Sequence, residues 1–211
     1  TRGEIQWLPA STWREEARRT FFVMGACFAL ALLAALYALM RAWKVRLAAY
    51  AVYSLAITSI CLAGILITGW GSTQYWPGLI PWRGGLASAA ACISSGLVLL
   101  LARRAFALEL SAPRWSVALL WVGAGCALAG MAGSLLSVQF SQTLSHFAAL
   151  TAAIMGMASI GLAWRTGNPV AIWLLAGFTP ILIAVVVTTL GIAGVWPFSP
   201  WMLLAMPLGS V

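Results

Sequence analysis

Charge is scarce in this sequence. Charged residues make up 8% of the 211 residues and hydrophobic residues 63%, and the mean hydropathy is +0.97. A soluble domain or a disordered chain needs far more charge than this. The formal net charge of +8 is spread over short segments between apolar runs and does not form a basic patch, so nucleic-acid binding is excluded too. The composition therefore predicts an integral membrane protein.

Acidic residues are nearly absent, and none lies in an apolar run. The four are Glu4, Glu15, Glu16 and Glu109. Proton-coupled pumps and transporters usually need a buried carboxylate or histidine relay, which these positions do not supply. The only lysine, Lys44, lies between apolar runs, so a retinal Schiff base has no attachment point inside the membrane.

Histidine occurs once, and this excludes haem ligation by two histidines of the chain. No nucleophile–base pair and no pair of carboxylates is evident, so we expect no catalytic residue, no enzyme activity and no cofactor. The cysteines lie inside apolar runs and form no C-x-x-C motif, which indicates small apolar side chains and neither a disulfide framework nor a metal site. The four are Cys27, Cys61, Cys92 and Cys126.

Long apolar runs are what the chain has instead. Their length and number predict an all-α integral membrane fold, a seven-transmembrane-helix bundle. The last run reaches only to the end of the sequence, so we expect a truncated helix that continues beyond Val211. The expected spans are Phe21–Met40, Leu47–Gly69, Gly84–Ala102, Trp115–Leu136, Leu144–Trp164, Val170–Ile192 and Trp201–Val211.

The residues before the first run are polar. They predict an extracytoplasmic segment over residues 1–19, followed by a seven-helix transmembrane domain over residues 20–211. Thr12 and Glu15 fit a capping box, so a helix is expected to begin near Thr12 and to run into the membrane. The stretch "EIQWLPA" ahead of it is either the end of an upstream sensor domain or a frayed terminus.

The distribution of Lys and Arg predicts the orientation. With the N-terminus outside, most of the cations fall in inner segments and two outer segments have none, which agrees with the positive-inside tendency. The inner cations are then Arg41, Lys44, Arg46, Arg103, Arg104, Arg114 and Arg165. We therefore expect the N-terminus outside and the C-terminus in the cytoplasm.

The segment "WGSTQYWPGLIPWRGG" places aromatic rings beside an amide and a guanidinium. Such a group is typical either of the floor of a pocket for a small external ligand or of an interfacial anchor. His146, near the outer end of the fifth run, is either part of that site, a pH sensor or an ordinary interfacial residue. The candidate ligand-binding residues are Trp70, Gln74, Tyr75, Trp76, Trp82, Arg83 and His146.

Small residues recur at four-residue spacing in two of the runs, which allows close approach of helix backbones in lipid. They are Gly84, Ser88, Cys92 and Gly96 in the third run, and Gly125, Ala129 and Gly133 in the fourth. These rows either pack inside the bundle or form a dimer seam. Pro180 and Pro207 interrupt the sixth and seventh runs and are either hinges or simple packing kinks.

Five short motifs occur in a characteristic order: "RAWKVRLAAYAVYSL", "TQYWPG", "LARRAFALE", "GNPVAIWLLAG" and "PLGSV". Together they resemble the bacterial seven-transmembrane-receptor domains with diverse intracellular signalling modules, the 7TMR-DISM family, from about residue 21 to residue 211. An alanine before Phe106 departs from that family's Arg-Phe-Leu signature.

This resemblance implies a sensory domain in the bacterial inner membrane. It implies relay of an extracytoplasmic cue to a cytoplasmic diguanylate cyclase or histidine kinase. It also implies a homodimer formed through that cytoplasmic part, which the sequence does not include.

Two other functions agree with the sequence. The chain is alternatively a structural or accessory subunit of a larger membrane complex, in which small-residue faces and tryptophans make the contacts. A carrier for a neutral or lipid-like solute is also compatible with the lack of buried charge, although no internal repeat or pair of broken helices supports it. In each case the lipid bilayer is an expected partner.

Overall fold

A computed structural model describes residues 10–68 and 77–167, and the elements in this part of the chain are helices. Five of them are long and apolar enough to cross a membrane. They are α1 (Ala10–Val45), α2 (Ala48–Thr68), α4 (Arg83–Ala105), α6 (Pro113–Ser134) and α7 (Val138–Arg165). A 3-10 helix, η1 (Pro77–Trp82), leads into α4, and the four-residue α5 (Leu108–Ser111) joins α4 to α6.

The five long helices overlap the first five apolar runs, so the expectation of five apolar helices of membrane-spanning length is confirmed there. The sixth and seventh runs, Val170–Ile192 and Trp201–Val211, lie outside the described residues. The candidate hinges Pro180 and Pro207 lie outside them as well.

Helix α1 is longer than its apolar run at both ends. It has 36 residues and already includes Ala10, so Thr12 lies within the helix and not at its cap. At the other end, the expected break "RAWKVR" is mostly helical, and only Arg46 and Leu47 separate α1 from α2. Arg46 has a left-handed conformation with φ 55°, the backbone state in which many helices end. Two residues therefore make the turn, where the expected spans were separated by residues 41–46.

Helix α7 begins at Val138, six residues before the expected start of the fifth span. Ser137 caps it, because its hydroxyl oxygen accepts a hydrogen bond from the backbone N–H of Phe140 at 3.2 Å. The hydroxyls of Ser141 and Ser145 donate to carbonyls of the preceding turn at 3.1 and 2.8 Å. The polar stretch between the expected fourth and fifth spans is thus largely helical, and these two hydroxyls are satisfied by carbonyls of the helix backbone.

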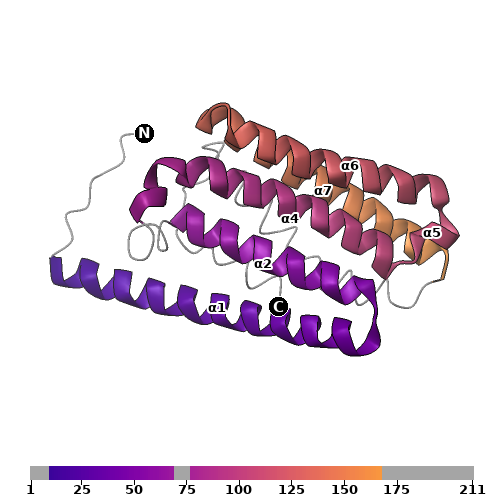
Figure 1. Ribbon diagram of the computed structural model, residues 1–211. Helices are drawn as coiled ribbons and strands as arrows, with labels where there is room; N and C mark the ends of the chain where they lie inside the picture. The colour runs from indigo at the N-terminus through magenta and orange to yellow at the C-terminus, as the bar shows by residue number, and fades with distance from the viewer. Residues whose placement is uncertain (1–9, 69–76, 168–211) are drawn as a thin grey trace.

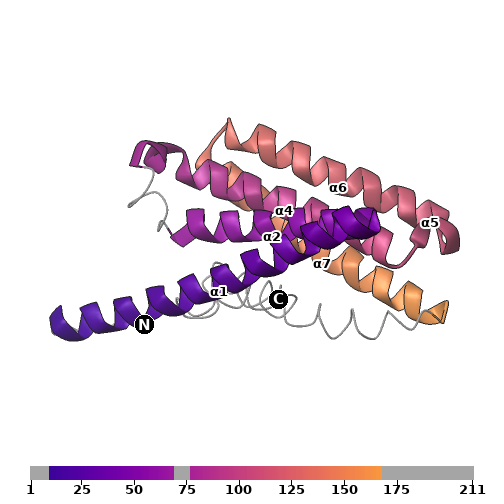
Figure 2. The ribbon, with the colours of Figure 1, turned by 60° about the horizontal axis from the view of Figure 1, so that its bottom comes forward.

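Helix α4 lies at the centre of the described bundle. It packs against α2, α6 and α7, whereas α1 packs against α2 at the edge (Figure 1). The most apolar stretch of α4 is 61% buried, against 28–39% in the other four spans. Figure 2 shows the same arrangement after rotation, with α1 crossing in front of α2.

Small side chains allow α4 to occupy this position. A Cβ added at Gly84 would lie 2.7 Å from Val138 Cγ1 of α7, and one at Gly85 would lie 3.0 Å from the carbonyl oxygen of Ser134. One at Gly96 would overlap the carbonyl of Gly123 in α6. The remaining members of the expected α4 row, Ser88 and Cys92, are buried. This row therefore faces helices of the same chain.

The contact surface of α6 differs from the expected row. Gly123 and Gly130 face α4, and a Cβ at Gly130 would overlap that of Cys92. Within the part of the chain that the structure describes, no atom lies within 4 Å of the Cβ position of Gly125. A Cβ added at Gly133 would lie 3.1 Å from Leu144 Cδ2 of α7. Gly123 and Gly130 are seven residues apart, about two helical turns, so they share a face that the four-residue row did not identify.

Candidate functional site

The outer-face residues proposed for ligand binding are only partly described. Trp82 ends η1 and is 61% exposed, and Arg83 follows it as the first, half-buried residue of α4. His146 is half-buried on α7, and the close approach of Gly84 to Val138 places the beginnings of α4 and α7 at the same end of the bundle. Four other candidates lie outside the described residues: Trp70, Gln74, Tyr75 and Trp76. An outer ligand site therefore stays a prediction.

A group of polar side chains lies at the opposite end of α4. The chain leaves α4 through Phe106 and then turns at Ala107, which has a left-handed conformation with φ 48°. This turn starts α5 and brings Glu109 back beside the last turn of α4, which carries Arg103 and Arg104. Cations at the C-terminal end of a helix also interact favourably with the helix dipole.

One carboxylate oxygen of Glu109 binds both arginines. Its Oε1 lies 3.0 Å from Arg103 Nη2 and 3.2 Å from Arg104 Nη1. Arg103 also donates from Nε to the hydroxyl of Ser116 in α6 at 2.7 Å. The Arg103 side chain is 18% exposed and Ser116 is buried, so these contacts are partly sheltered from solvent. A single guanidinium therefore joins α4 to both α5 and α6.

A second polar contact joins α6 to α7. The indole Nε1 of Trp115 donates to the hydroxyl oxygen of Ser159 at 2.9 Å, and Ser159 in turn donates to the Met155 carbonyl at 2.7 Å. Ser159 is fully buried. We refer to the residues of these two contacts as the polar cluster: Arg103, Arg104, Glu109, Trp115, Ser116 and Ser159.

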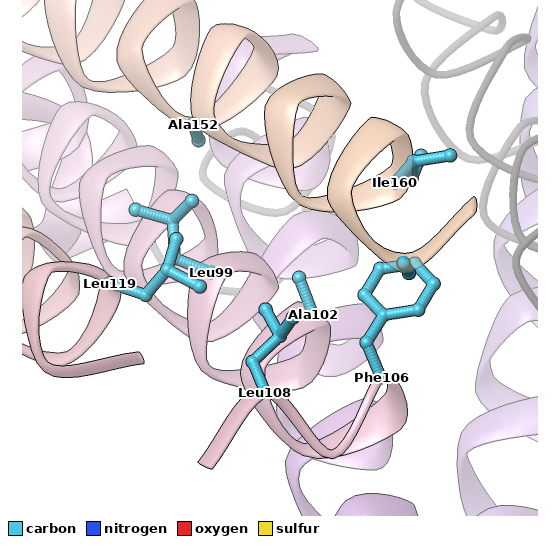
Figure 3. Packing of buried hydrophobic residues seen from close by; sticks show 8 residues of the cluster. Leu99, Ala102, Phe106, Leu108, Leu119, Ala152 and Ile160 are labelled. Atoms are coloured by element: carbon cyan, nitrogen blue, oxygen red, sulfur yellow. The ribbon is translucent and has the colours of Figure 1, made fainter. Parts of the chain in front are cut away.

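An apolar core formed by side chains of four helices packs against Trp115 of the polar cluster. Figure 3 shows Phe106, from the turn after α4, beside Ile160 of α7, while Leu99 and Leu119 meet between α4 and α6. Trp115 packs against this core and also donates its hydrogen bond. Because the indole is held by both kinds of contact, its position is fixed more firmly than by packing alone.

The contacts of the polar cluster connect different helices. Each of its contacts has a defined donor and acceptor on different helices, so a shift of α4 or α7 against α6 breaks particular bonds. Within residues 10–68 and 77–167, no group of three His, Cys, Asp or Glu side chains is placed to hold a metal ion. The cluster therefore holds α4, α5, α6 and α7 in one relative arrangement through directional contacts.

Sequence reasoning recognised the residues around this turn but not their contacts. Arg103 and Glu109 are six residues apart, which is not a helical pair spacing, and they meet only because Ala107 reverses the chain. Trp115 and Ser159 are 44 positions apart. The available signal was the presence of the only acid after Glu16 close to two adjacent arginines.

A shallow groove lies between α6 and α7. It has a volume of about 290 Å³ and an almost wholly apolar lining in which Thr151 supplies a hydroxyl. The lining residues include Gly125 and Ala129, which the sequence assigned to helix packing. Both are therefore placed beside open space in the described part of the bundle.

Comparison with known proteins gives one match. A family model described as "7TM diverse intracellular signalling" matches residues 20–211. No curated protein and no solved structure gives a significant match to the chain.

Proposed function

Because the chain belongs to the 7TM diverse intracellular signalling family, a family of sensory transmembrane domains, we propose that it relays an extracytoplasmic cue to a cytoplasmic output module. The module is a diguanylate cyclase or a histidine kinase. The chain itself contributes no catalysis, and its membrane helices pass on a change of packing.

The polar cluster is the observation that carries this proposal. It links α4, α5, α6 and α7 at one end of the bundle through an ion pair, a guanidinium–hydroxyl bond and an indole–hydroxyl bond. Polar contacts between helices in lipid are each worth about 1 kcal/mol, enough to fix one packing without locking it. In the proposed mechanism, an external cue changes the relative position of these helices, and the cluster either keeps or loses its contacts.

The proposed topology has seven spans, the N-terminus outside and the C-terminus in the cytoplasm of a bacterial inner membrane. Support comes from the charges at one end of the described bundle, where α1, α4 and α7 end and α2 and α6 begin (Figure 1). We call this the basic end. It carries Arg41, Lys44, Arg46, Arg103, Arg104, Arg114 and Arg165. Such an excess of cations favours the cytoplasmic side.

The proposed partners follow from the same function. A homodimer through the cytoplasmic output module would let a change in one bundle act on paired catalytic domains. A small external ligand near Trp82, Arg83 and His146, or an upstream sensor domain, would supply the cue.

The test uses the full-length native protein in cells. Glu109→Gln removes the carboxylate that holds Arg103 and Arg104. Cyclic di-GMP level and histidine phosphorylation are both measured, together with the amount of protein in the membrane. We expect the resting output to change about fivefold or more, as a coupling free energy of 1–3 kcal/mol allows.

Arg114→Gln is the matched control, because Arg114 is exposed at the same end and has no ion-pair partner among the described residues. Its output should equal that of the wild type. Unchanged output in Glu109→Gln at normal protein level contradicts relay through the cluster. A stable stoichiometric membrane partner would instead favour an accessory subunit, and solute uptake by reconstituted protein would favour a carrier.

A further inference from the structure

The connection between α1 and α2 concentrates positive charge. Arg41, Lys44 and Arg46 fall within six residues, and all three are exposed. None of them has an ion-pair partner in the described part of the chain. After Glu16 the sequence contains one acidic residue, Glu109, which already contacts Arg103 and Arg104. The three cations are therefore available to an anion from outside the chain.

An exposed apolar stripe on α1 leads directly to these cations. Leu33, Tyr37 and Met40 are spaced by four and three residues, so they share one face of the helix, and they are 61%, 59% and 65% exposed. Lys44 continues the same face one turn beyond Met40. The stripe thus runs from apolar through aromatic to basic within about three helical turns.

Aromatic side chains lie where the exposed face of α1 changes from apolar to basic residues. Trp43 is 88% exposed beside Lys44, and the Arg41 guanidinium lies over the Tyr37 ring at 6.0 Å from its centroid. Tryptophan and tyrosine settle at the height of lipid headgroups. The cations beside Trp43 therefore lie at headgroup level, and the exposed Leu33, about three helical turns from Trp43 along α1, lies at the depth of acyl chains.

We propose that this α1–α2 corner, defined by Arg41, Lys44 and Arg46 with Trp43, binds the headgroup of an anionic phospholipid. The phosphate lies between the cations, and an acyl chain follows the stripe through Met40 and Tyr37. Phosphatidylglycerol has the required chemistry, because it joins a net negative headgroup to long apolar chains. The proposal depends neither on the orientation of the bundle nor on the signalling function.

The site is specific to this corner of the basic end. On the other side of the bundle, the carboxylate of Glu109 satisfies Arg103 and Arg104, so an outside anion gains less there. Arg114 and Arg165 are exposed at the same end but are single cations on separate helices. This difference provides a control that loses the same charge from the same end.

The experiment measures lipid binding to the purified full chain in detergent. Dioleoylphosphatidylglycerol and dioleoylphosphatidylcholine have the same acyl chains, and native mass spectrometry gives the dissociation constant of each. We expect wild-type protein to prefer phosphatidylglycerol by about tenfold, since each nearby Lys or Arg strengthens binding to anionic lipid severalfold. The variant Lys44→Gln/Arg46→Asn should lose this preference, and Asn keeps the left-handed backbone at position 46.

Arg114→Gln/Arg165→Gln is the matched control, and it should keep the preference. Equal loss in both double variants would overturn the proposal in favour of general attraction by net charge. The absence of any preference in wild-type protein would also overturn it and would point to an acidic protein surface as the partner. Displacement of the lipid by millimolar inorganic phosphate would assign the corner to a small soluble anion instead.

Discussion

The described bundle has two kinds of helix contact. In the half formed by α4, α6 and α7, two glycines pack against each other, whereas in the half formed by α1 and α2 a glycine packs against a phenylalanine ring. Gly96 and Gly123 bring two backbones together, and Arg103 and Trp115 add polar contacts across the same helices. Between α1 and α2, the ring of Phe28 lies against Gly64 within an apolar cluster.

The two interfaces differ in how far their atoms can move without a shift of the helices. A backbone atom cannot move without moving its helix, and a directional hydrogen bond fixes one relative position. A side chain within an apolar cluster can shift by rotation about its own bonds. We therefore expect the α4–α6–α7 half to hold one packing strictly and the α1–α2 half to tolerate small changes.

The largest effect should come from a branched side chain at the glycine contact. Gly96→Val places a Cβ on the carbonyl of Gly123, and neither backbone can move aside without separating α4 from α6. We expect a loss of at least about 3 kcal/mol of stability, seen as loss of folded protein after detergent extraction. Gly125→Ala is the control, because no atom of residues 10–68 and 77–167 lies within 4 Å of its Cβ position. Similar folded yields for the two variants would refute the strict packing of this half.

The next effect should come from the guanidinium that joins three helices. Arg103→Ala removes the bonds to Glu109 and to Ser116, and it leaves the buried Ser116 hydroxyl without that partner. We expect about 2 kcal/mol of destabilisation, measured by thermal unfolding in detergent. Arg104→Ala removes one contact at a side chain that is 47% exposed and should cost about 0.5 kcal/mol or less. If Arg104→Ala lowers the stability as much as Arg103→Ala does, the hydrogen bond from Arg103 to Ser116 is not the cause of the larger loss.

The sequence predicted some parts of these two halves and missed others, for physical reasons. Apolar length alone locates a membrane helix, so the first five spans were found. Helix ends depend on single residues, and the cap at Ser137 and the left-handed Arg46 therefore moved the limits of α7 and α1. The α4 row of small residues marked a helix with crowded neighbours, but the matching face of α6 depends on which side of α6 meets α4.

The candidate sites also differ in how far the sequence could predict them. The polar cluster joins residues whose separations in sequence follow no local rule, so only the fold brings Trp115 to Ser159. The outer ligand site rests on composition. Its described members, Trp82, Arg83 and His146, make no hydrogen bond or ion pair with one another within residues 10–68 and 77–167, so the site stays a prediction.

A smaller effect should follow from loss of the indole donor. Trp115→Phe keeps a ring in the apolar core but removes the hydrogen bond to Ser159. Ser159 keeps its bond to the Met155 carbonyl, so no hydroxyl hydrogen is left without an acceptor. We expect a loss of about 0.6 kcal/mol, the average for such bonds in membrane proteins, and at most about 1.7 kcal/mol, measured by thermal unfolding. The double variant Trp115→Phe/Ser159→Ala tests this. If the indole N–H contributes only through its bond to Ser159, the double variant should lose no more stability than Ser159→Ala alone.

The smallest effect gives the sharpest comparison of the two halves, because one substitution is made in each. Gly64→Ala in α2 and Gly85→Ala in α4 both gain about 1 kcal/mol of helix propensity. At Gly64 the new Cβ would lie 2.8 Å from Phe28 Cζ, the far end of a side chain, whereas at Gly85 it would lie 3.0 Å from the backbone oxygen of Ser134. A small rotation of the Phe28 side chain about its Cα–Cβ bond displaces Cζ and can relieve the first contact, so its cost and the propensity gain should nearly cancel. The second contact cannot be relieved without moving α6, so Gly85→Ala should be destabilised relative to Gly64→Ala by about 1 kcal/mol in thermal unfolding. Equal stability of the two variants would mean that the nature of the neighbouring atom does not decide the cost, and the distinction between a strict half and an adjustable half would fail.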